Sequence, residues 1–304
     1  MNLTVGMVGL GRMGGNMSRR LARAGHAVVA WDRADAARRA LADEPGVEPV
    51  STLPELVARL PAPRPVWLML PAGAPTETTL MQLADVLERG DVVIDGANAY
   101  YRDSQRHATD LATRGIAFVD AGVSGGVWGL ENGYGLVVGG EAAAVQSVEP
   151  LLRALAPSPD RGWVHCGRAG AGHYAKMVHN GIEYGMMQAY AEGLALLRAK
   201  AELELDVASV AEAWRHGTVI RSWLLDLTAE FLAGDAELES IAPYVADSGE
   251  GRWTAHESIE LGVPTPVMTL ALMERFASQG RADYANRLLA RMRQAFGGHA
   301  VKPG

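Results

Sequence analysis

The stretch Leu3-Thr-Val-Gly-Met-Val-Gly-Leu-Gly-Arg-Met-Gly14 decides the fold of the amino-terminal half. An apolar run, Leu3–Val8, leads into the glycine pattern Gly9-x-Gly11-x-x-Gly14, and a segment with helical periodicity follows from Met13 to Ala24. A strand, a glycine-rich turn and a helix in this order form an anion site, because the first backbone amides of the helix lack intrahelical partners. We therefore expect a dinucleotide to bind here.

Each glycine has its own task in such a turn. Gly9 makes the tight turn, Gly11 lets the backbone approach a pyrophosphate, and Gly14 lets helix and strand pack closely. The next predicted strand ends at Asp32, 18 residues after Gly14, where an acidic side chain binds the adenosine ribose hydroxyls. Asp32 favours NAD, because a carboxylate repels the 2′-phosphate of NADP, whereas Arg33 could receive that phosphate. Asp32 has more weight because it lies at the strand end, and NAD is the expected cofactor. The candidate cofactor-binding residues are Gly9, Gly11, Met13, Gly14, Asp32, Arg33 and Asn98.

Residues 1–166 alternate short apolar runs with amphipathic segments. The runs are rich in Val, Ile and Leu, as expected of parallel strands covered on both faces. Predicted strands are Leu3–Val8, Ala27–Trp31, Val66–Leu70, Val92–Asp95, Ile116–Val119, Gly135–Val138 and Trp163–Cys166. Predicted helices include Met13–Ala24, Thr76–Glu88, Ser104–Arg114 and Glu141–Leu155. Repeated βαβ units predict a Rossmann-type, doubly wound α/β sheet.

The pattern changes after the glycine cluster Gly167–Gly172. Residues 173–304 have almost no alternating pattern and many long helical ones, so we expect an all-α carboxyl-terminal domain. The predicted domains are 1–166, which binds the dinucleotide, and 167–304, which serves substrate binding and oligomerisation, with the glycine cluster as a hinge. Clefts between domains are favoured ligand sites.

The first helix expected after the hinge presents an unusual face. Offsets of three, four, seven and eight residues place Lys176, His179, Asn180, Glu183 and Tyr184 on one side. A solvated charged face is the simpler interpretation, but such a face favours Glu, Lys and Gln, whereas Asn and Gly are weak helix formers. A base and a carboxylic acid two turns apart can instead act on neighbouring atoms of one small substrate.

Two loops are expected beyond the carboxyl ends of strands, where ligands bind in open α/β sheets. Asp95-Gly-Ala-Asn98 presents Asn98, and Val123-Ser-Gly-Gly126 presents the Ser124 hydroxyl and the open amides of Gly125 and Gly126. A plain turn is the alternative for the second loop. Because the Lys176 helix is expected to enter the same cleft, we favour the binding of a carboxylate or hydroxyl.

Composition excludes several classes. The chain has 304 residues and a net charge of −7, which argues against a nucleic-acid partner. The single cysteine, Cys166, excludes an internal disulfide and a thiolate metal cluster and fits a reducing cytoplasm, and no metal is expected. The sequence contains no 18-residue apolar run and no basic leader, so neither a membrane span nor a signal peptide is expected.

These motifs together resemble the 6-phosphogluconate dehydrogenases, within the β-hydroxyacid dehydrogenase superfamily. The most specific stretch is Gly172-His-Tyr-Ala-Lys-Met-Val-His-Asn-Gly-Ile-Glu-Tyr-Gly185. The resemblance also rests on Gly9–Gly14, Asp95–Asn98, Val123–Gly126, Ile220–Ser222, Gly251–Thr254 and Phe296–His299. At its length, the chain is similar to the short, bacterial, NAD-preferring form.

The resemblance implies oxidative decarboxylation of 6-phosphogluconate to ribulose 5-phosphate. Lys176 would take the proton of the C3 hydroxyl while hydride leaves C3, which requires a neutral amine at that moment. The resulting β-keto acid loses CO₂, and Glu183 would protonate C1 of the enediol. The catalytic candidates are Lys176, Glu183, Asn180 and His179. The residues expected to orient the substrate carboxylate and hydroxyls are Asn98, Ser124, Gly125, Gly126, His179 and Asn180.

The phosphate end of the substrate depends on a further set implied by the resemblance. That set is Tyr184, Arg221, Arg293 and His299. The last two would reach the phosphate of a neighbouring subunit, so a homo-oligomer with at least a dimer is expected. One departure concerns Ser248 and Glu250, which stand where the larger enzymes carry a Lys and a Thr that contact phosphate. A carboxylate there is unfavourable unless Arg252 compensates.

Two alternative functions need only part of this set of residues. A β-hydroxyacid dehydrogenase that acts on a small unphosphorylated acid needs the same Lys176 but not Glu183, Arg221 and Arg293 together. A catalytically silent dinucleotide sensor keeps Gly9–Asp32 and has no need of Lys176 and Glu183 on one face.

Overall fold

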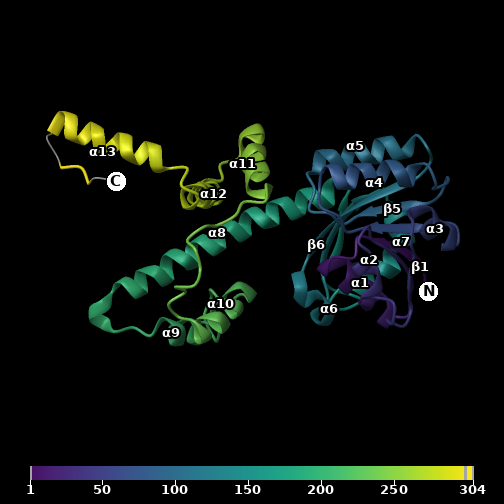
Figure 1. The fold of residues 1–304 in the computed structure, drawn as a ribbon, viewed down its shortest axis with the longest axis horizontal. Helices are drawn as coiled ribbons and strands as arrows, with labels where there is room; N and C mark the ends of the chain where they lie inside the picture. Colours follow the sequence, from purple (N-terminus) through teal and green to yellow (C-terminus); the bar gives the residue numbers. More distant parts are fainter. Residues whose placement is uncertain (1, 298–299, 303–304) are drawn as a thin grey trace. The chain divides into compact units, whose positions relative to one another are not determined.

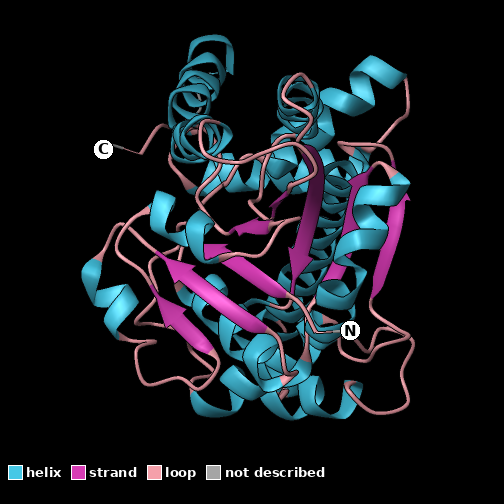
Figure 2. Ribbon diagram, turned by 90° about the vertical axis from the view of Figure 1, so that its right-hand side faces the viewer, coloured by secondary structure: helices cyan, strands magenta, loops and turns pink. Residues whose placement is uncertain are grey.

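The computed structural model describes residues 2–297 and 300–302. The chain divides into two compact units, Met1–Met177 and Val178–Gly304. The first unit contains the sheet and the second is helical (Figures 1 and 2).

In the described residues the sheet has eight strands in the order β3-β2-β1-β4-β5-β6-β7-β8. The strands are β1 (Thr4–Val8), β2 (Ala27–Trp31), β3 (Val47–Pro49), β4 (Pro65–Leu68), β5 (Val92–Asp95), β6 (Ala117–Ser124), β7 (Gly135–Gly140) and β8 (Trp163–Gly167). The helices of this unit are α1 (Arg12–Arg23), α2 (Asp35–Arg39), α3 (Leu53–Arg59), α4 (Ala74–Ala84), α5 (Tyr101–Ala112), α6 (Gly129–Asn132) and α7 (Ala142–Leu155), with the 3₁₀ turn η1 (Gly126–Trp128). The predicted doubly wound α/β sheet is confirmed.

Two hydrophobic cores cover the faces of the sheet. On one face α1 and α7 bury Met17, Leu21 and Leu151 against β1, β2 and β7. On the other, α3, α4 and α5 bury Leu56 and Leu83 against β4 and β5, and α4 and α5 lie beside each other in Figure 1. The central strands are buried on both sides, which explains why their sequences read as continuous apolar runs rather than alternating ones.

One strand pair departs from the parallel arrangement expected of the apolar runs. β6 and β7 pair antiparallel, with Ser124 opposite Gly135, whereas the other strand pairs are parallel. The connection from Gly125 to Tyr134 contains only η1 and the four-residue α6. A parallel return needs a crossover of a dozen or more residues, usually with a full helix, so this short connection makes the chain double back.

The long helix α8 (Ala171–Ala199) begins in the first unit and continues into the second. The second unit adds η2 (Ala201–Leu203), α9 (Val207–Trp214), α10 (Trp223–Gly234), α11 (Glu250–Leu261), α12 (Pro266–Ser278) and α13 (Asp283–Gly297). Its strandless character within the described residues confirms the predicted all-α carboxyl-terminal half. The helices of the described chain include none with the length and apolar character that a membrane crossing requires.

Two small clusters hold the helices of the second unit together. Leu225 and Leu232 of α10 pack with Ala211 of α9, and Tyr190 and Leu194 of α8 lie against them. Tyr184 of α8 packs with Leu272 of α12. Both clusters are small compared with the two hydrophobic cores of the sheet. Many apolar side chains of this unit are therefore exposed on its surface.

Candidate active site

The turn between β1 and α1 has the geometry that its glycines predict. Gly9 has a φ of +93°, a conformation that side-chain-bearing residues rarely adopt. A Cβ on Gly9 would lie 2.4 Å from the Met69 carbonyl oxygen, and one on Gly14 only 1.9 Å from the Gly9 carbonyl oxygen. Helix α1 therefore lies against β1 at a distance that only glycine permits.

Gly11 differs from its two neighbours in the motif. A Cβ at this position would meet nothing within 4 Å, so the turn is open to a ligand there. Gly11 is also the N-cap of α1, without a side-chain hydrogen bond, and the first turn of the helix has no acidic residue. The start of α1 thus keeps its amides and its positive dipole end for an anion such as a pyrophosphate.

Asp32 directly follows β2 and holds the glycine-rich turn. Its Oδ2 accepts the Leu10 amide at 2.7 Å and its Oδ1 accepts the Ala34 amide at 2.8 Å. Each carboxylate oxygen has a second lone pair, so Asp32 retains acceptor capacity for ribose hydroxyls. The Arg33 side chain lies on the surface beside it.

Asn98 follows the end of β5 in a short, tightly held loop. Asp95 is fully buried, and its Oδ1 accepts the Ala97 amide at 3.0 Å. Ala97 is buried and Asn98 is exposed, so the loop presents the Asn98 amide at the carboxyl edge of the sheet.

The Ser-Gly-Gly loop follows the end of β6. Ser124 is the last residue of that strand and is half-buried. Gly125 and Gly126 have φ values of +126° and +52°, which turn the chain sharply away from the sheet. Gly126 is exposed, and a Cβ at this position would meet nothing within 4 Å.

Lys176 packs against the same strand, β6, at Gly122, which precedes Ser124 by two residues. A Cβ on Gly122 would be 2.4 Å from the Lys176 Cβ and 2.8 Å from Val137 Cγ2. A Cβ on Gly172, one turn earlier in α8, would be 2.6 Å from the Asp120 carbonyl oxygen. The two glycines let α8 approach β6 closely, and the Lys176 side chain is only 9% exposed.

The next turns of α8 carry the other predicted polar groups. His179 Nδ1 lies 3.0 Å from Asn180 Oδ1 and 3.9 Å from a Glu183 carboxylate oxygen. Asn180 is 8% exposed, whereas the side chains of His179 and Glu183 are 50% and 40% exposed. A continuous helix places Lys176 and Glu183 on one face, about 10 Å apart along its axis.

Tyr184 lies beside a cation that the sequence did not reveal. The guanidinium carbon of Arg275, on α12, is 3.5 Å from the centre of the Tyr184 ring. Arg275 also donates to the Ala246 carbonyl oxygen at 2.8 Å, which fixes the guanidinium over the ring. The only signal of Arg275 in the sequence was a basic residue in the last turn of a helix, which is common in any protein.

The structure also answers the question raised by Glu250. The Ser248 hydroxyl donates to Glu250 Oε2 at 2.6 Å, lies 3.5 Å from the Tyr184 hydroxyl, and Glu250 is 2% exposed. Arg252 forms an ion pair with Asp247 rather than with Glu250. The Glu250 carboxylate is therefore turned into the protein and accepts a hydrogen bond there.

The remaining predicted phosphate ligands are not brought to Tyr184. Arg221 precedes α10 and is exposed, and within the described residues its side chain forms no hydrogen bond or ion pair. Arg293 is exposed on α13, and His299 lies outside the described residues.

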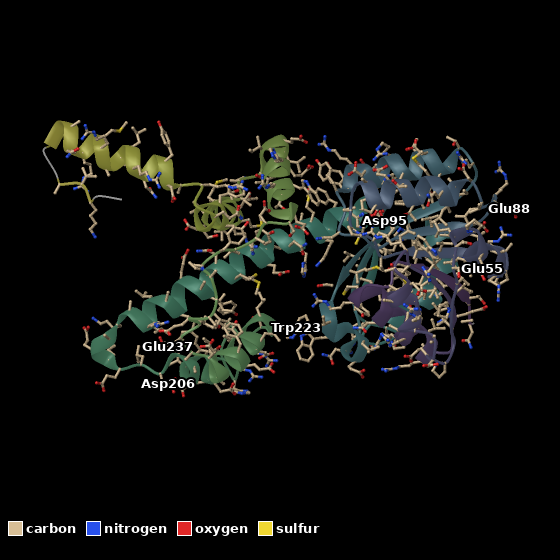
Figure 3. All side chains as sticks on the ribbon, viewed as in Figure 1. Glu55, Glu88, Asp95, Asp206, Trp223 and Glu237 are labelled. Atoms are coloured by element: carbon tan, nitrogen blue, oxygen red, sulfur yellow. The ribbon has the colours of Figure 1, made fainter. Side chains whose placement is uncertain are left out.

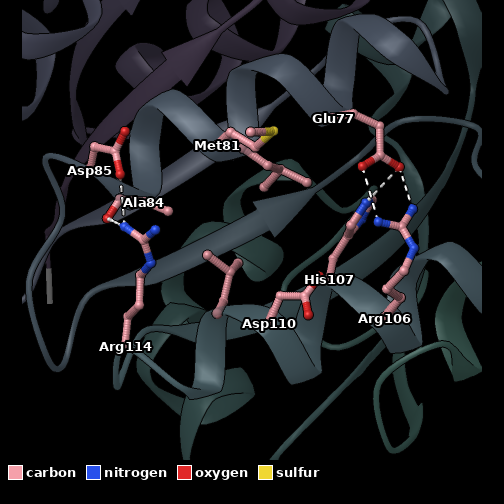
Figure 4. Close-up of a pocket in the computed structure, with 10 residues that line it drawn as sticks. Glu77, Met81, Ala84, Asp85, Arg106, His107, Asp110 and Arg114 are labelled. Atoms are coloured by element: carbon pink, nitrogen blue, oxygen red, sulfur yellow. Dashed lines mark hydrogen bonds and ion pairs between the residues drawn. The ribbon is translucent and has the colours of Figure 1, made fainter.

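A separate pocket of about 340 Å³ lies between α4 and α5 (Figure 4). Arg106 and His107 both bind the Glu77 carboxylate there, and Arg114 pairs with Asp85. The hydrogen bond from Arg106 is the main cause that lowers the pKa of Glu77 to about 2. None of the predicted site residues lines this pocket, and we do not assign the reaction to it. The described residues contain no cluster of His, Cys, Asp and Glu suited to a metal ion.

Comparisons with known proteins agree on one family. The family described as the NAD binding domain of 6-phosphogluconate dehydrogenase matches residues 4–167, and the 6-phosphogluconate dehydrogenase C-terminal domain matches residues 172–301. An NAD(+)-dependent, decarboxylating 6-phosphogluconate dehydrogenase of Haloferax volcanii is 43% identical over 300 residues, which cover 98% of each chain.

Two solved structures are similar to the chain over most of its length. The 6-phosphogluconate dehydrogenase of Plasmodium falciparum superposes with a TM-score of 0.83 at 29% identity, over 99% of this chain and 67% of that one. The 3-hydroxyisobutyrate dehydrogenase of Mycobacterium tuberculosis gives a TM-score of 0.73 at 24% identity, over 93% of this chain and 94% of that one. The second likeness shows a shared fold alone.

Proposed function

The chain belongs to the 6-phosphogluconate dehydrogenase family, in its short, NAD-dependent, decarboxylating form, and we propose how its own residues carry out that reaction. The substrate is 6-phosphogluconate and the products are ribulose 5-phosphate and CO₂. The single observation that carries the assignment of roles is the buried Lys176, held against β6 by Gly122 beside the Ser-Gly-Gly loop.

The cofactor site fits a dinucleotide. The open space over Gly11 and the uncapped start of α1 suit a pyrophosphate, with Met13 and Gly14 in the first turn behind it. Asp32 receives the ribose hydroxyls and disfavours a 2′-phosphate, while Arg33 lies outside at the surface. When bound, NAD supplies the hydride acceptor for the oxidation at C3.

Lys176 is the general base for the C3 hydroxyl proton. The step requires a neutral amine at that moment, and Lys176 is buried against β6 beside the Ser-Gly-Gly loop. Oxidation at C3 gives a β-keto acid, and the Lys176 ammonium then polarises the C3 ketone while the bond to the carboxylate breaks and CO₂ leaves. The proton thus stays on one side chain until the enediol forms.

Glu183 is the acid that completes the reaction. It lies two turns from Lys176 on the same helix face. Lys176 serves C3 of the substrate, and Glu183 serves the neighbouring carbon, C2 of the substrate, which becomes C1 of the product. Its carboxyl group donates a proton to C1 of the enediol, and Lys176 accepts the proton of the neighbouring enediol hydroxyl, so that the ketone forms. His179, within 3.9 Å of Glu183, and the buried Asn180 orient the hydroxyls of the substrate.

Asn98 and the Ser-Gly-Gly loop bind the carboxylate end of the substrate. The exposed Asn98 amide, the Ser124 hydroxyl and the amides of Gly125 and Gly126 all follow the carboxyl ends of neighbouring strands, β5 and β6. Such donors suit a carboxylate or hydroxyl oxygen, which accepts hydrogen bonds.

The phosphate end is bound by Tyr184 and cationic side chains. Arg275 is the best placed of them, because its guanidinium already lies on the Tyr184 ring. Arg221 and Arg293 have no side-chain partner within the described residues and are available for this task. Arginine suits it because its planar fork can bind phosphate with two parallel hydrogen bonds.

We also infer a homo-oligomer in the cytoplasm. Helices α12 and α13 expose a set of large apolar side chains, namely Val267, Leu270, Tyr284, Leu289 and Met292. Exposed apolar surface of this kind is typical of protein contacts, and a second copy would also bring Arg293 to a neighbouring site. The sole cysteine, Cys166, is a free, exposed thiol, which fits a reducing compartment.

Solvent isotope incorporation tests the division of labour between Lys176 and Glu183. Product formed by the wild-type enzyme in D₂O should carry deuterium at C1 with one stereochemistry. Glu183→Gln should slow turnover about 10²-fold or more, the usual effect of losing a positioned acid. Stereorandom label in the wild-type product would remove Glu183 from this role. Parallel assays with D-gluconate and 3-hydroxyisobutyrate test the alternative that the substrate is a small unphosphorylated acid. That alternative predicts faster oxidation of such an acid than of 6-phosphogluconate.

A further inference from the structure

A group of buried polar side chains lies behind Lys176 in the first unit and takes no part in the mechanism above. Asp95 ends β5, Ser104 is on α5 and His173 is in the first turn of α8. Asp95 and Ser104 are 0% exposed and His173 is 1% exposed. Figure 3 labels Asp95, which lies in the interior of the sheet unit.

Two of the atoms in this group lack partners. Ser104 Oγ lies 2.6 Å from His173 Nδ1, which leaves Nε2 at the other edge of the ring. Asp95 Oδ1 accepts the Ala97 amide, which leaves Oδ2. Among the described residues, neither His173 Nε2 nor Asp95 Oδ2 has a hydrogen-bond partner, although both are buried.

The two unpartnered atoms belong to residues that are neighbours in the fold. Asp95 and Asp120 are register partners on β5 and β6, and the Asp120 carboxylate accepts the His173 amide at 2.7 Å. A buried polar atom without a hydrogen bond costs about 1–3 kcal/mol, so two such atoms of opposite character in one interior are unfavourable unless they satisfy each other.

We propose that Ser104, His173 and Asp95 form one buried hydrogen-bonded chain, in which His173 is a positioning residue for Lys176. The Ser104 hydroxyl donates to Nδ1, and Nε2–H donates to Asp95 Oδ2, directly or through one water molecule. This arrangement gives every buried polar atom of the three side chains a partner. It also fixes the imidazole in the neutral Nε2–H tautomer, as an acceptor carboxylate does for other histidines.

This hydrogen-bonded chain connects the backbone segments that carry the site residues. Asp95 shapes the loop that presents Asn98, and His173 lies one turn before Lys176 on α8. The Asp120 carboxylate on β6 adds to this attachment, because it accepts the His173 amide at 2.7 Å and the Gly170 amide at 2.6 Å. Loss of the chain would let the first turn of α8 shift relative to the Asn98 loop.

A nucleophilic role for Ser104 does not fit this arrangement. The order serine, histidine and aspartate is that of a hydrolytic triad, but a triad needs a serine that a substrate can reach. Ser104 is 0% exposed. The hydrogen-bonded chain therefore acts through Lys176 and does not touch the substrate. Its kinetic consequences rest on the proposed function of Lys176.

The tautomer of His173 gives a direct test that needs no turnover. Nitrogen NMR of the ¹⁵N-histidine-labelled enzyme, without substrate or cofactor, should show His173 with a proton on Nε2 and none on Nδ1. In Asp95→Asn the amide oxygen should keep the Ala97 amide, so the NH₂ group takes the place of Oδ2. It would then face Nε2 as a donor, and the His173 proton should move to Nδ1. A wild-type ring protonated on Nδ1, or a tautomer unchanged by Asp95→Asn, overturns the proposal.

Kinetics test the positioning role. Asp95→Asn should lower kcat about 10- to 100-fold at temperatures where the variant is fully folded, with the KM for NAD unchanged, because a displacement of about 1 Å is costly for a catalytic group. Ser104→Ala, which removes one hydrogen bond, should give a smaller loss. His26→Gln is the matched control: His26 is also buried in this unit, where its Nδ1 accepts the Leu3 amide, and kcat should not change.

The outcomes separate this proposal from the proposed function. A lower melting temperature for Asp95→Asn with wild-type kcat in the folded enzyme would show a structural role only and would overturn the positioning role. If the wild type does not oxidise 6-phosphogluconate, the proposed function fails, and the tautomer experiment still decides whether the hydrogen-bonded chain exists.

Discussion

Gly122→Ala should separate the position of Lys176 from its chemistry. An alanine Cβ at this position would lie 2.4 Å from the Lys176 Cβ and 2.8 Å from Val137 Cγ2. Carbon atoms in contact prefer about 3.5–4.0 Å, so α8 must move away from β6 by about 1 Å. The contact with Lys176 cannot be relieved by a rotation of that side chain, because Cβ is fixed to the backbone.

The expected cost is in turnover more than in stability. A shift of about 1 Å of a catalytic group costs on the order of 10²-fold in rate, whereas overpacking of a well-packed site destabilises a protein by about 1–3 kcal/mol. Initial rates of NADH formation at 340 nm, with saturating NAD and 6-phosphogluconate, give kcat. Circular dichroism at the assay temperature should show that the variant remains folded.

Gly193→Ala is the matched control on the same helix. A Cβ at Gly193 meets nothing within 4 Å, and alanine favours a helix over glycine by about 1 kcal/mol. Its kcat should equal that of the wild type. A folded Gly122→Ala enzyme with wild-type kcat would refute the idea that the close approach of α8 to β6 positions Lys176.

Three further perturbations test other parts of the site and the fold. NAD should give the higher kcat/KM, and Asp32→Asn should move the preference toward NADP, since a repulsion of about 2 kcal/mol corresponds to roughly 30-fold discrimination; a wild type that prefers NADP tenfold contradicts this. Arg293→Ala should raise the KM for 6-phosphogluconate roughly 10- to 150-fold, the effect of losing one charge-assisted contact, while the KM for NAD stays the same; a fully active monomer by light scattering speaks against a shared site. Glu77 has a folded-state pKa of about 2, below its ordinary value of 4.5, so its contribution to stability is present above pH 4.5 and is lost as pH falls toward 2. After allowance for its partial exposure, Glu77→Gln should be less stable by about 1 kcal/mol at pH 7, and calorimetry should find this difference shrinking in acid.

The sequence predicted those parts of the fold that local rules determine. The strand–turn–helix at Gly9–Gly14 and the helix from Ala171 to Ala199 were predictable because glycine spacing and helical periodicity act over a few residues. The short β3 was missed because three residues, one of them Pro49, give no periodic signal. The direction of β7 was missed because its sequence is as apolar as that of a parallel strand. Only the length of the connection between β6 and β7 determines whether the two strands run parallel or antiparallel.

The site was predictable only where its residues share one segment. Lys176, Asn180 and Glu183 lie on one helix, so their spacing indicated a common face. Arg275 is 91 residues from Tyr184 in the sequence (275 − 184), and nothing local marks it as a neighbour. The same holds for Ser104 and His173, whose contact requires the packing of two separate helices.

The role of Lys176 is the central claim, and Lys176→Met tests it most directly, because methionine keeps the length and apolar stem of the side chain without the amine. We predict that the wild type forms NADH from NAD and 6-phosphogluconate at 340 nm. We predict that Lys176→Met, folded and still able to bind NAD by fluorescence titration, loses about 10²–10⁴-fold or more in kcat. A folded Lys176→Met enzyme that retains wild-type kcat would contradict the account.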